Sequence, residues 1–318
     1  MRAAYLVEPS ADHPVEAIRV GDLPAPTAPP GWVHVDVRAG ALNMHDIWTL
    51  RGVGPRPHGG PHVIGSDAAG VADGREVIVY PVLPTAPNGR TVPHATLLPD
   101  AGHGVLAERI AVPAHHLVPK PAGLSWAEAA CLPTAWLTAY RMLFTRTTVG
   151  PGRVVLVQGA GGGVATAAIG LATAAGATVF VTSRSPAKRD RALALGAAAA
   201  LDSGDRVPEL ADVVVETVGP ATFGHSVRST RAGGTIVVCG GTSGFTADLD
   251  LTRLFAREIT VHGSTMGTLD EFRALVAFVD THLVRPTVDS TVDLADVRTQ
   301  ADRMLAGTGF GKLCVSLT

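Results

Sequence analysis

The chain has 318 residues, of which 46% are hydrophobic and 17% charged, a balance typical of a globular protein large enough for two domains. Its 26 basic and 28 acidic residues give a formal net charge of −2, which argues against nucleic acid or an anionic membrane as a main partner. The sequence has no apolar run of the roughly 18 residues that a membrane span needs and no signal-peptide core near its start, so we expect a cytoplasmic protein without a membrane partner.

Residues 1 to about 120 read as short strands separated by turns. The runs WVHVDV from Trp32 and EVIVY from Glu76 have the alternating, β-branched pattern of strands, and prolines and glycines gather between them. The segment from Thr85 to Val105 is rich in turn formers and is expected to be an exposed loop. This part of the chain is therefore predicted to be an irregular, β-rich domain.

Within this part, the stretch ALNMHD at positions 41–46 places an amide, an imidazole and a carboxylate within four residues. Asn43, His45 and Asp46 could hold a metal, move a proton, or cap a helix. The residues alone leave these three alternatives open. Three scattered cysteines, Cys131, Cys239 and Cys314, form no C-x-x-C pair and predict neither a disulfide framework nor a cysteine metal site.

From about residue 121 the pattern changes to alternating helices and strands. Ser125 and Glu128 form a capping box before a helical run that should break at Pro133 and resume through Tyr140. Apolar strands then alternate with helices of about 10 to 15 residues, which predicts an α/β fold with a parallel sheet covered on both faces. The strands read RVVLVQGA, ATVFVTS, DVVVETVG and GGTIVVCGG. Thr268 and Glu271 open a further helix with the same capping pattern.

The segment VVLVQGAGGGVATAAIGLA is typical of a dinucleotide cradle, because a buried strand enters glycines and then directly a helix. Glycines let the backbone approach a pyrophosphate, whose charge meets the N–H groups and the positive end of the helix. The strict G-x-G-x-x-G pattern is absent, since the frame reads Ala160-x-Gly162-x-x-Ala165. The order of strand, loop, helix and further βα units carries the prediction.

The second strand ends in TSRSPAK, without the acidic side chain that usually holds the ribose 2′-hydroxyl of NAD. Ser183, Arg184 and Lys188 instead offer a hydroxyl and two cations, the groups that a 2′-phosphate needs. The sequence thus predicts NADPH rather than NADH as the cofactor. An ordinary solvated helix start is the alternative interpretation.

Taken together, the motifs resemble those of the medium-chain dehydrogenase/reductase superfamily along nearly the whole chain. The pieces that carry the resemblance are ALNMHDIWTLRG, GSDAAGV, AACLPTAWLTAYRML, VLVQGAGGGVATAAIGLA, VVVETVG, RAGGTIVVCG, GSTMGT and GFGKLCV. The resemblance implies a GroES-like catalytic domain at 1–120 with a C-terminal return at 258–318, and a Rossmann domain at 121–257. It also implies a nicotinamide cofactor in the cleft between domains and, commonly, a homodimer paired through the Rossmann sheets.

Zinc-dependent members of this superfamily hold a catalytic metal with residues that correspond here to Asn43, Ser66 and Thr134. None of these is a good zinc ligand, because zinc takes thiolate, imidazole or carboxylate. The lobe that carries structural cysteines in those enzymes would fall near 85–105, where this chain has no cysteine. We therefore expect no metal site, and the resemblance is greatest to the zinc-free quinone-oxidoreductase-like and enoyl-reductase-like branch.

The resemblance also places catalytic and cofactor contacts. Asn43 would bind the substrate oxygen or the cofactor ribose, Asp46 would support the helix, and Trp48 would pack against a flat substrate. His45 is either the proton donor or only a capping group, and water is the alternative donor. The expected cofactor-binding residues are Thr134, Thr138, Tyr140, Ala160, Gly161, Gly162, Gly163, Val164, Ser183, Arg184, Lys188, Gly240, Gly241, Ser264, Met266, Gly311 and Lys312.

Without a Lewis acid, a simple ketone is a hard target for hydride, whereas a conjugated acceptor spreads the incoming charge onto oxygen. The chain is accordingly expected to be an NADPH-dependent reductase of a quinone or an α,β-unsaturated carbonyl compound. Two alternatives remain: an NADPH-binding sensor or interaction protein without turnover, and an alcohol dehydrogenase. The sequence does not name the acceptor.

Overall fold

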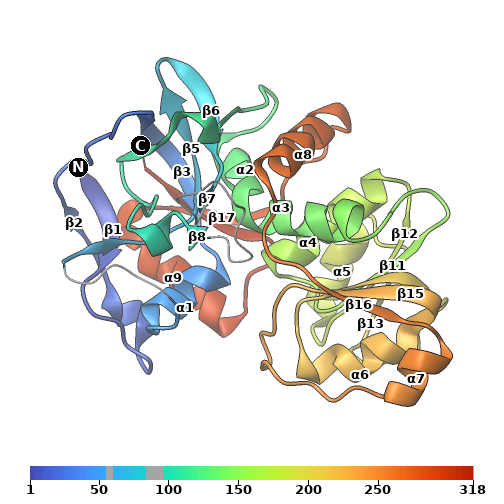
Figure 1. Cartoon of the computed structure of the whole chain (residues 1–318). Helices are drawn as coiled ribbons and strands as arrows, with labels where there is room; N and C mark the ends of the chain where they lie inside the picture. The colour runs from blue at the N-terminus through green and yellow to red at the C-terminus, as the bar shows by residue number, and fades with distance from the viewer. Residues whose placement is uncertain (55–59, 84–95, 318) are drawn as a thin grey trace. The chain divides into compact units, whose positions relative to one another are not determined.

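The computed structural model describes residues 1–54, 60–83 and 96–317, which form two compact units (Figure 1). Each unit has its own sheets and its own core. The first unit comprises Met1–Thr134, Thr268–Asp280 and Val288–Thr318, and the second comprises Ala135–Gly267 and Thr281–Thr287.

A mostly antiparallel sheet of seven strands organises the first unit. Its path runs β10-β6-β5-β3-β18-β17, with β9 also pairing with β3, and only β17 and β18 run parallel to each other. The strands are β3 (Trp32–Ala41), β5 (Asp67–Ala72), β6 (Arg75–Val79), β9 (Arg109–Pro113), β10 (Leu117–Pro119), β17 (Val288–Asp293) and β18 (Lys312–Ser316). Strand β3 pairs on one side with β5 and on the other with β18, so it brings both to the start of the following helix.

Smaller elements complete the first unit around a core that includes Val35, Val37, Ile47 and Leu106. A three-stranded sheet has the order β2-β1-β4, and β7 pairs with β8. These strands are β1 (Arg2–Leu6), β2 (Ile18–Asp22), β4 (His62–Val63), β7 (Val82–Leu83) and β8 (Thr96–Leu97). The helices are α1 (Met44–Leu50), α2 (Trp126–Ala130), α8 (Leu269–Thr281) and α9 (Val297–Ala306), with short 3-10 turns η1 (Pro14–Ala17), η2 (Pro99–Ala101), η3 (Ala114–His116) and η6 (Leu294–Asp296).

The second unit contains the predicted parallel sheet, in the order β13-β12-β11-β14-β15-β16. Figure 1 shows helices on both sides of it, with α4 and α5 on one side and α6 and α7 on the other. The strands are β11 (Val154–Val157), β12 (Thr178–Thr182), β13 (Ala199–Leu201), β14 (Ala211–Glu216), β15 (Thr230–Val238) and β16 (Thr260–Gly263). The helices are α3 (Leu137–Tyr140), α4 (Gly163–Ala174), α5 (Pro186–Ala194), α6 (Pro220–Ser229) and α7 (Leu251–Ala256).

The boundaries of these units differ from the expected 121 and 257. Residues 121–134 belong to the first unit, because α2 packs on β3, β5 and β18. Residues 258–267 belong to the second unit, because β16 extends the parallel sheet beside β15. The predicted C-terminal return therefore begins at Thr268 rather than at 258.

The local predictions at two helix starts and at one proline agree with the structure. Ser125 and Thr268 both receive the reciprocal bonds of a capping box, as the sequence predicts. The helical run does break near Pro133, since α2 ends at Ala130 with Cys131 as its C-cap; Pro133 then lies in a π-helical turn, η4 (Leu132–Trp136), that continues into α3 and a second such turn, η5 (Arg141–Thr145). A wider turn accommodates a residue without an N–H while the chain keeps its direction.

The predicted loop 85–105 lies partly outside the described residues; its described part forms β8 and η2. Across the described ranges, no helix is both long and apolar enough to cross a membrane.

Candidate functional site

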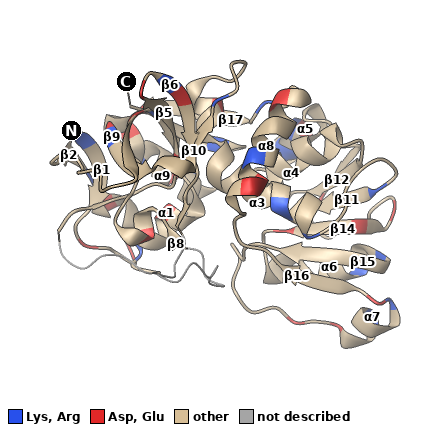
Figure 2. Ribbon diagram, turned by 45° about the horizontal axis from the view of Figure 1, so that its top comes forward, with Lys and Arg blue, Asp and Glu red and all other residues tan. Residues whose placement is uncertain are grey.

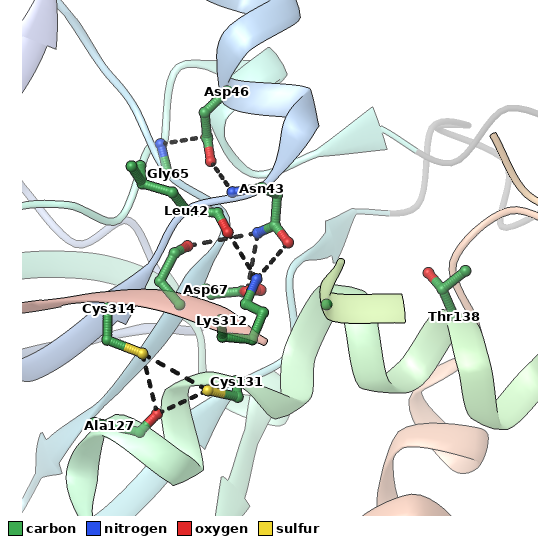
Figure 3. A network of polar contacts seen from close by, with 12 residues as sticks. Leu42, Asn43, Asp46, Gly65, Asp67, Ala127, Cys131, Thr138, Lys312 and Cys314 are labelled. Carbon is green, nitrogen blue, oxygen red and sulfur yellow. Dashed lines mark hydrogen bonds and ion pairs between the residues drawn. The ribbon is translucent and has the colours of Figure 1, made fainter. Parts of the chain in front are cut away.

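A buried lysine lies at the centre of the polar site of the first unit. Lys312 begins β18, Asp67 begins β5, and Asn43 is the N-cap of α1, so the pairing of β3 with both strands brings the three together. Figure 3 shows their side chains pointing toward one another. The Lys312 Nζ donates to Asn43 Oδ1 at 2.6 Å, to Asp67 Oδ2 at 2.9 Å and to the backbone oxygen of Leu42 at 2.8 Å. We call Asn43, Asp67 and Lys312 the lysine cluster.

The lysine cluster is closed to water. The exposed fractions of Asn43, Asp67 and Lys312 are 8%, 0% and 2%. Burial disfavours the Lys312 ammonium, but attraction and hydrogen bonding by Asp67 outweigh it and raise the pKa of Lys312. The lysine is therefore a permanent cation that compensates a fully buried carboxylate.

The cluster also fixes what its members can still bind. An ammonium has three donors, and those of Lys312 are used inside the first unit, so the structure does not support its expected role as a cofactor contact. Asn43 Nδ2 donates to Asp67 Oδ2 at 2.9 Å and lies 3.5 Å from the oxygen of Ala41. The carboxamide is thus held in one orientation. Its oxygen accepts from Lys312 and one N–H donates to Asp67, so only the weakly bound second N–H is left for a substrate or ribose.

Asp46 supports the helix that carries the site. Its Oδ2 accepts from the N–H of Asn43 at 2.7 Å, closing the capping box, and its Oδ1 accepts from the N–H of Gly65 at 3.1 Å. Burial raises the pKa of Asp46 to about 6, although these donors and the cations nearby favour its ionised form. Gly65 has φ +94° and lies against Leu106, which only a glycine can do without strain.

His45 lies on the first turn of α1 and makes a bond that its sequence context does not reveal. Its Nε2 is 2.8 Å from Asp100 Oδ1 in η2, and the exposed side-chain fractions are 28% for His45 and 8% for Asp100. Trp48, one turn further along, is half-buried beneath the guanidinium of Arg51, whose centre is 5.5 Å from the ring. The expected substrate contact of Trp48 stays a prediction.

The three positions that would hold zinc by resemblance carry Asn43, Ser66 and Thr134. The Oγ of Ser66 and the Oγ1 of Thr134 are buried and have no hydrogen-bond partner in the described parts of the chain, and the same holds for Oδ1 of Asp67. A carboxamide already bound to a lysine and two hydroxyls do not fit zinc, which prefers thiolate and imidazole. The orphaned hydroxyls fit a polar ligand atom or a water instead.

Two thiols lie beneath this site without forming a disulfide. Cys131 Sγ and Cys314 Sγ are 3.7 Å apart, and both are completely buried. Burial, together with the neighbouring thiol, raises the pKa of Cys131 well above its usual value. They behave as packed thiols rather than as metal ligands, and the described ranges hold no group of three His, Cys, Asp or Glu residues that could bind a metal.

In the second unit, the turn between β11 and α4 forms the predicted loop. We call residues 159–162 the glycine loop. Gly161 has φ +125°, and a methyl group there would meet the Lys188 side chain at 2.8 Å. Gly162 is the N-cap of α4 and offers no side chain to the first N–H groups of the helix. These N–H groups and the nearby ammonium of Lys188 together favour the binding of a phosphate group.

The end of β12 lies beside this loop, because the N–H of Ala160 donates to the oxygen of Thr182 at 2.8 Å. Ser183 is buried, Arg184 is exposed, and Ser185 caps α5, whose first turn carries Lys188. In Figure 2 basic residues mark α5. The hydroxyl and the two cations predicted for a 2′-phosphate are therefore brought to one edge of the parallel sheet.

A buried polar network lies behind the glycine loop, and no sequence motif predicts it. Gln158 Oε1 accepts from Thr182 Oγ1 at 2.6 Å, and its Nε2 donates to His225 Nδ1 at 2.8 Å and to Ser226 Oγ at 3.0 Å. Ser226 in turn donates to Glu216 Oε2 at 2.6 Å. These polar residues follow apolar strands and helices at no recognisable spacing, which is why no motif marks them.

Glu216 extends this network to the turn that follows β14. Its Oε1 accepts from the N–H groups of Val218 and Gly219 at 2.8 and 3.0 Å, which fixes the turn after β14. Gly219 and Gly241 both lie close to the oxygen of Gly244, where a side chain would clash. The expected cofactor contacts Gly240 and Gly241 thus lie in a segment whose backbone packs closely against the backbone oxygen of Gly244.

The remaining expected cofactor residues are spread over both units. Thr138 Oγ1 donates to Met266 Sδ at 3.8 Å, and Met266 has the uncommon φ of +45°. Ser264 is buried, and its hydroxyl has no partner within the described chain. The other members are Tyr140, whose ring lies 4.9 Å from that of Phe144, Gly163 and Val164 at the start of α4, and Gly311, with φ +105°, directly before Lys312. Their cofactor contacts stay predictions.

Comparison with known proteins agrees with this architecture. Residues 163–281 match the model of the zinc-binding dehydrogenase family. A zinc-type alcohol dehydrogenase-like protein of Schizosaccharomyces pombe is 30% identical, with 91% of each chain covered. A crotonyl-CoA reductase of Streptomyces collinus is 29% identical over 95% of this chain and 83% of the relative.

Solved structures agree as well. One described as an NAD-dependent alcohol dehydrogenase has a TM-score of 0.91 at 32% identity and covers 99% of both chains. Another, a 2-octenoyl-CoA carboxylase reductase in complex with NADP and 2-octenoyl-CoA, has a TM-score of 0.87 at 26% identity, covering 99% of this chain and 87% of that one. The predicted combination of a GroES-like domain with a Rossmann domain is thereby confirmed.

Proposed function

This chain belongs to the medium-chain dehydrogenase/reductase superfamily, and from that premise we propose that it is a zinc-independent, NADPH-dependent reductase of α,β-unsaturated carbonyl compounds. Enoyl thioesters are the favoured acceptors, with quinones as the alternative within the same chemistry. The observation that carries the proposal is that the three zinc-ligand positions hold Asn43 of the lysine cluster and the orphaned hydroxyls of Ser66 and Thr134. The positions that would bind zinc hold a locked amide and two hydroxyls, so the site can offer hydrogen bonds but no Lewis acid.

Hydrogen bonds suffice for a conjugated acceptor but not for an isolated ketone. In an enoyl group the electron pair displaced by hydride moves onto the carbonyl oxygen, where buried hydroxyl donors stabilise it. Ser66 and Thr134 provide such donors, and the second N–H of Asn43 is weakly engaged. Reduction of enoyl-CoA compounds is also what the names of two similar proteins describe.

NADPH as the cofactor is supported by the second unit. The glycine loop and the N-terminus of α4 would hold the pyrophosphate, and Ser183, Arg184 and Lys188 would meet the 2′-phosphate. When bound, the cofactor supplies a hydride. One similar structure is described with NADP and another as NAD-dependent, so the cofactor preference belongs in the test.

The test is a matrix of two cofactors and three acceptor classes. We expect NADPH to be oxidised with crotonyl-CoA or an enone and not with a saturated ketone. We expect kcat/KM with NADH to be lower than with NADPH by about tenfold or more, which corresponds to the loss of one charge-assisted contact. Zinc measured by elemental analysis should be far below one equivalent. Stoichiometric zinc with alcohol oxidation would show an alcohol dehydrogenase, and tight NADPH binding without turnover of any acceptor would show a sensor.

We also propose that the protein is a homodimer paired along β16. This strand is an edge of the parallel sheet in the described chain, and large apolar side chains are exposed on it and in the segment that precedes it: Val261, Phe245, Leu251 and Phe255. Exposed edges and apolar patches of this kind are usually covered. Light scattering should give twice the chain mass of 32.7 kDa, and Phe255→Glu should shift the mass toward that of a monomer.

A further inference from the structure

The bond between His45 and Asp100 joins two segments that are 55 residues apart in the chain. His45 is on α1, directly before the buried Asp46 and two residues after Asn43 of the lysine cluster. Asp100 is in η2, which follows β8. The pair therefore lies on the helix whose N-cap belongs to the lysine cluster, close enough to Asp46 for its charge to act on His45.

Both members of the pair are held in place. Leu98, at the start of η2, is fully buried, and its N–H donates to the oxygen of Pro81 at 2.8 Å. The turn closes through the N–H of His103, which donates back to Leu98 at 2.8 Å. On the other side, Thr49 Oγ1 donates to the backbone oxygen of His45 at 3.1 Å. These contacts fix the backbones that carry the two side chains, and the bond to Asp100 favours one orientation of the imidazole ring.

The two ring nitrogens of His45 then have different tasks. Nε2 is bound to Asp100, whereas Nδ1 has no hydrogen-bond partner in the described part of the chain. With a side chain 28% exposed, the ring can regain a proton from solvent after each turnover. This arrangement of a carboxylate, an imidazole and a second, available nitrogen is the one in which histidine moves protons efficiently.

We propose that Asp100 is the positioning residue of the proton donor: it binds Nε2 of His45 and leaves Nδ1–H to protonate the enolate that hydride addition produces. The inference rests on the proposed reductase function. Hydride adds to the β-carbon of the acceptor, and the former π pair passes to the α-carbon and the carbonyl oxygen as an enolate. The Nδ1–H bond of the imidazolium breaks, its electron pair stays on nitrogen, and the proton joins the α-carbon. Water then returns a proton to His45.

The charges around His45 support the cationic form that this step needs. Burial lowers the pKa of His45, but the hydrogen bond and charge of Asp100 and the charge of Asp46 outweigh it, so the pKa is raised. Two further elements, η1 and α9, pack on α1, and their charged groups bind elsewhere or are exposed. In η1, Glu16 pairs with His13. In α9, Arg298 binds Ile18, Arg303 binds Asp289, and Asp302 is exposed.

The direction of the pH effect follows from this balance. A raised pKa means that the proton donor is present below that pKa and is lost as the pH rises through it. Turnover should therefore fall on the alkaline side. Asp100→Asn keeps an oxygen that can accept from Nε2 but removes the charge, so the fall should move to lower pH.

The experiment follows the pH dependence of crotonyl-CoA reduction with saturating NADPH in four forms of the full chain. They are the wild type, Asp100→Asn, Asp100→Glu and the exposed control Asp302→Asn. We expect Asp100→Asn to lower kcat near neutral pH about tenfold, to shift the alkaline fall downward and to leave the KM for NADPH unchanged. Asp100→Glu should restore part of both, and Asp302→Asn should match the wild type.

A second readout separates this inference from the proposed function. The imidazole resonances of the 12 histidines can be followed by NMR, with that of His45 identified by its loss in His45→Gln. The His45 signal should titrate at lower pH in Asp100→Asn than in the wild type. Equal titration, or superimposable pH–rate profiles, would overturn the role of Asp100 even if crotonyl-CoA is reduced. If no conjugated acceptor is turned over, the proposed function fails first, and the proton-donor role fails with it.

Discussion

The two polar centres of this molecule, the lysine cluster and the glycine loop, differ in how their polar groups are paired. The lysine cluster buries full charges and compensates each with a partner from a distant part of the chain. The glycine loop uses almost no side chains; it presents backbone N–H groups and keeps its cations at the rim. In the lysine cluster, the charged groups are already paired with one another, and their bonds hold the site in shape. At the glycine loop, the first N–H groups of α4 receive no capping side chain, and a phosphate would accept their hydrogen bonds.

The difference predicts how each centre fails. Removing one charge from a closed cluster leaves another charge buried and uncompensated, whereas removing one group from an open loop weakens ligand binding more than folding. The largest effects on stability should therefore come from the first unit, and the largest ratio of binding loss to stability loss from the second.

Lys312→Met should have the largest effect. The Asp67 carboxylate, which is completely buried, would lose its cation, and we expect the free energy of unfolding to fall by about 3–5 kcal/mol. Urea denaturation monitored by circular dichroism measures it. The double variant Lys312→Met, Asp67→Asn should recover part of the loss, because no charge then remains buried.

A matched control lies in the same unit. Arg109 pairs with Asp36 at 2.7 Å, but the two side chains are 49% and 47% exposed, so Arg109→Met should cost far less than Lys312→Met. Equal losses for Lys312→Met and Arg109→Met would contradict the distinction between a closed cluster and an ordinary ion pair.

Gly161→Ala should have an intermediate effect. The residue has φ +125°, a conformation that alanine rarely adopts, and its methyl group would press on Lys188, so we expect a cost of about 1–3 kcal/mol and weaker NADPH binding. Gly162→Ala is the control, because Gly162 has φ −75° and open space around its Cα. Thermal unfolding and fluorescence titration with NADPH measure the two effects, and similar destabilisation by both alanines would argue against the strained geometry.

Arg184→Ala should have the smallest effect on folding. Arg184 is exposed, so the free energy of unfolding should change by no more than about 0.5 kcal/mol. The KM for NADPH should nevertheless rise about tenfold while that for NADH stays constant, because only NADPH carries the 2′-phosphate. The exposed Arg206 provides the comparison, since Arg206→Ala should change neither constant. An unaltered preference for NADPH in Arg184→Ala would remove this residue from the phosphate site.

The same contrast explains how much the sequence could reveal. The glycine loop, the strand before it and the helix after it are contiguous, so their order alone predicted a parallel sheet and a dinucleotide site. The lysine cluster joins residues 24 to 269 positions apart, and the His45–Asp100 pair spans 55. No local pattern encodes such contacts, because the tertiary fold creates them.

One short strand had no local signal. The strand Ala199–Leu201 lies in a run of alanines that resembles a helix, and only its pairing with β12 makes it a strand. Tertiary packing here overrides the residue preference. At Pro133, by contrast, the residue itself marks the interruption, since α2 ends at Ala130, shortly before it.

The position of Lys312 also bears on how the protein is made. The entire second unit leaves the ribosome before β18 does, so that unit can fold while the first is still unfinished. Until residue 312 has left the exit tunnel, Asp67 has no ammonium to meet, and the sheet lacks the strand beside β3. Nascent chains stalled a few residues short of this point should carry a folded second unit and a first unit that proteases still cut.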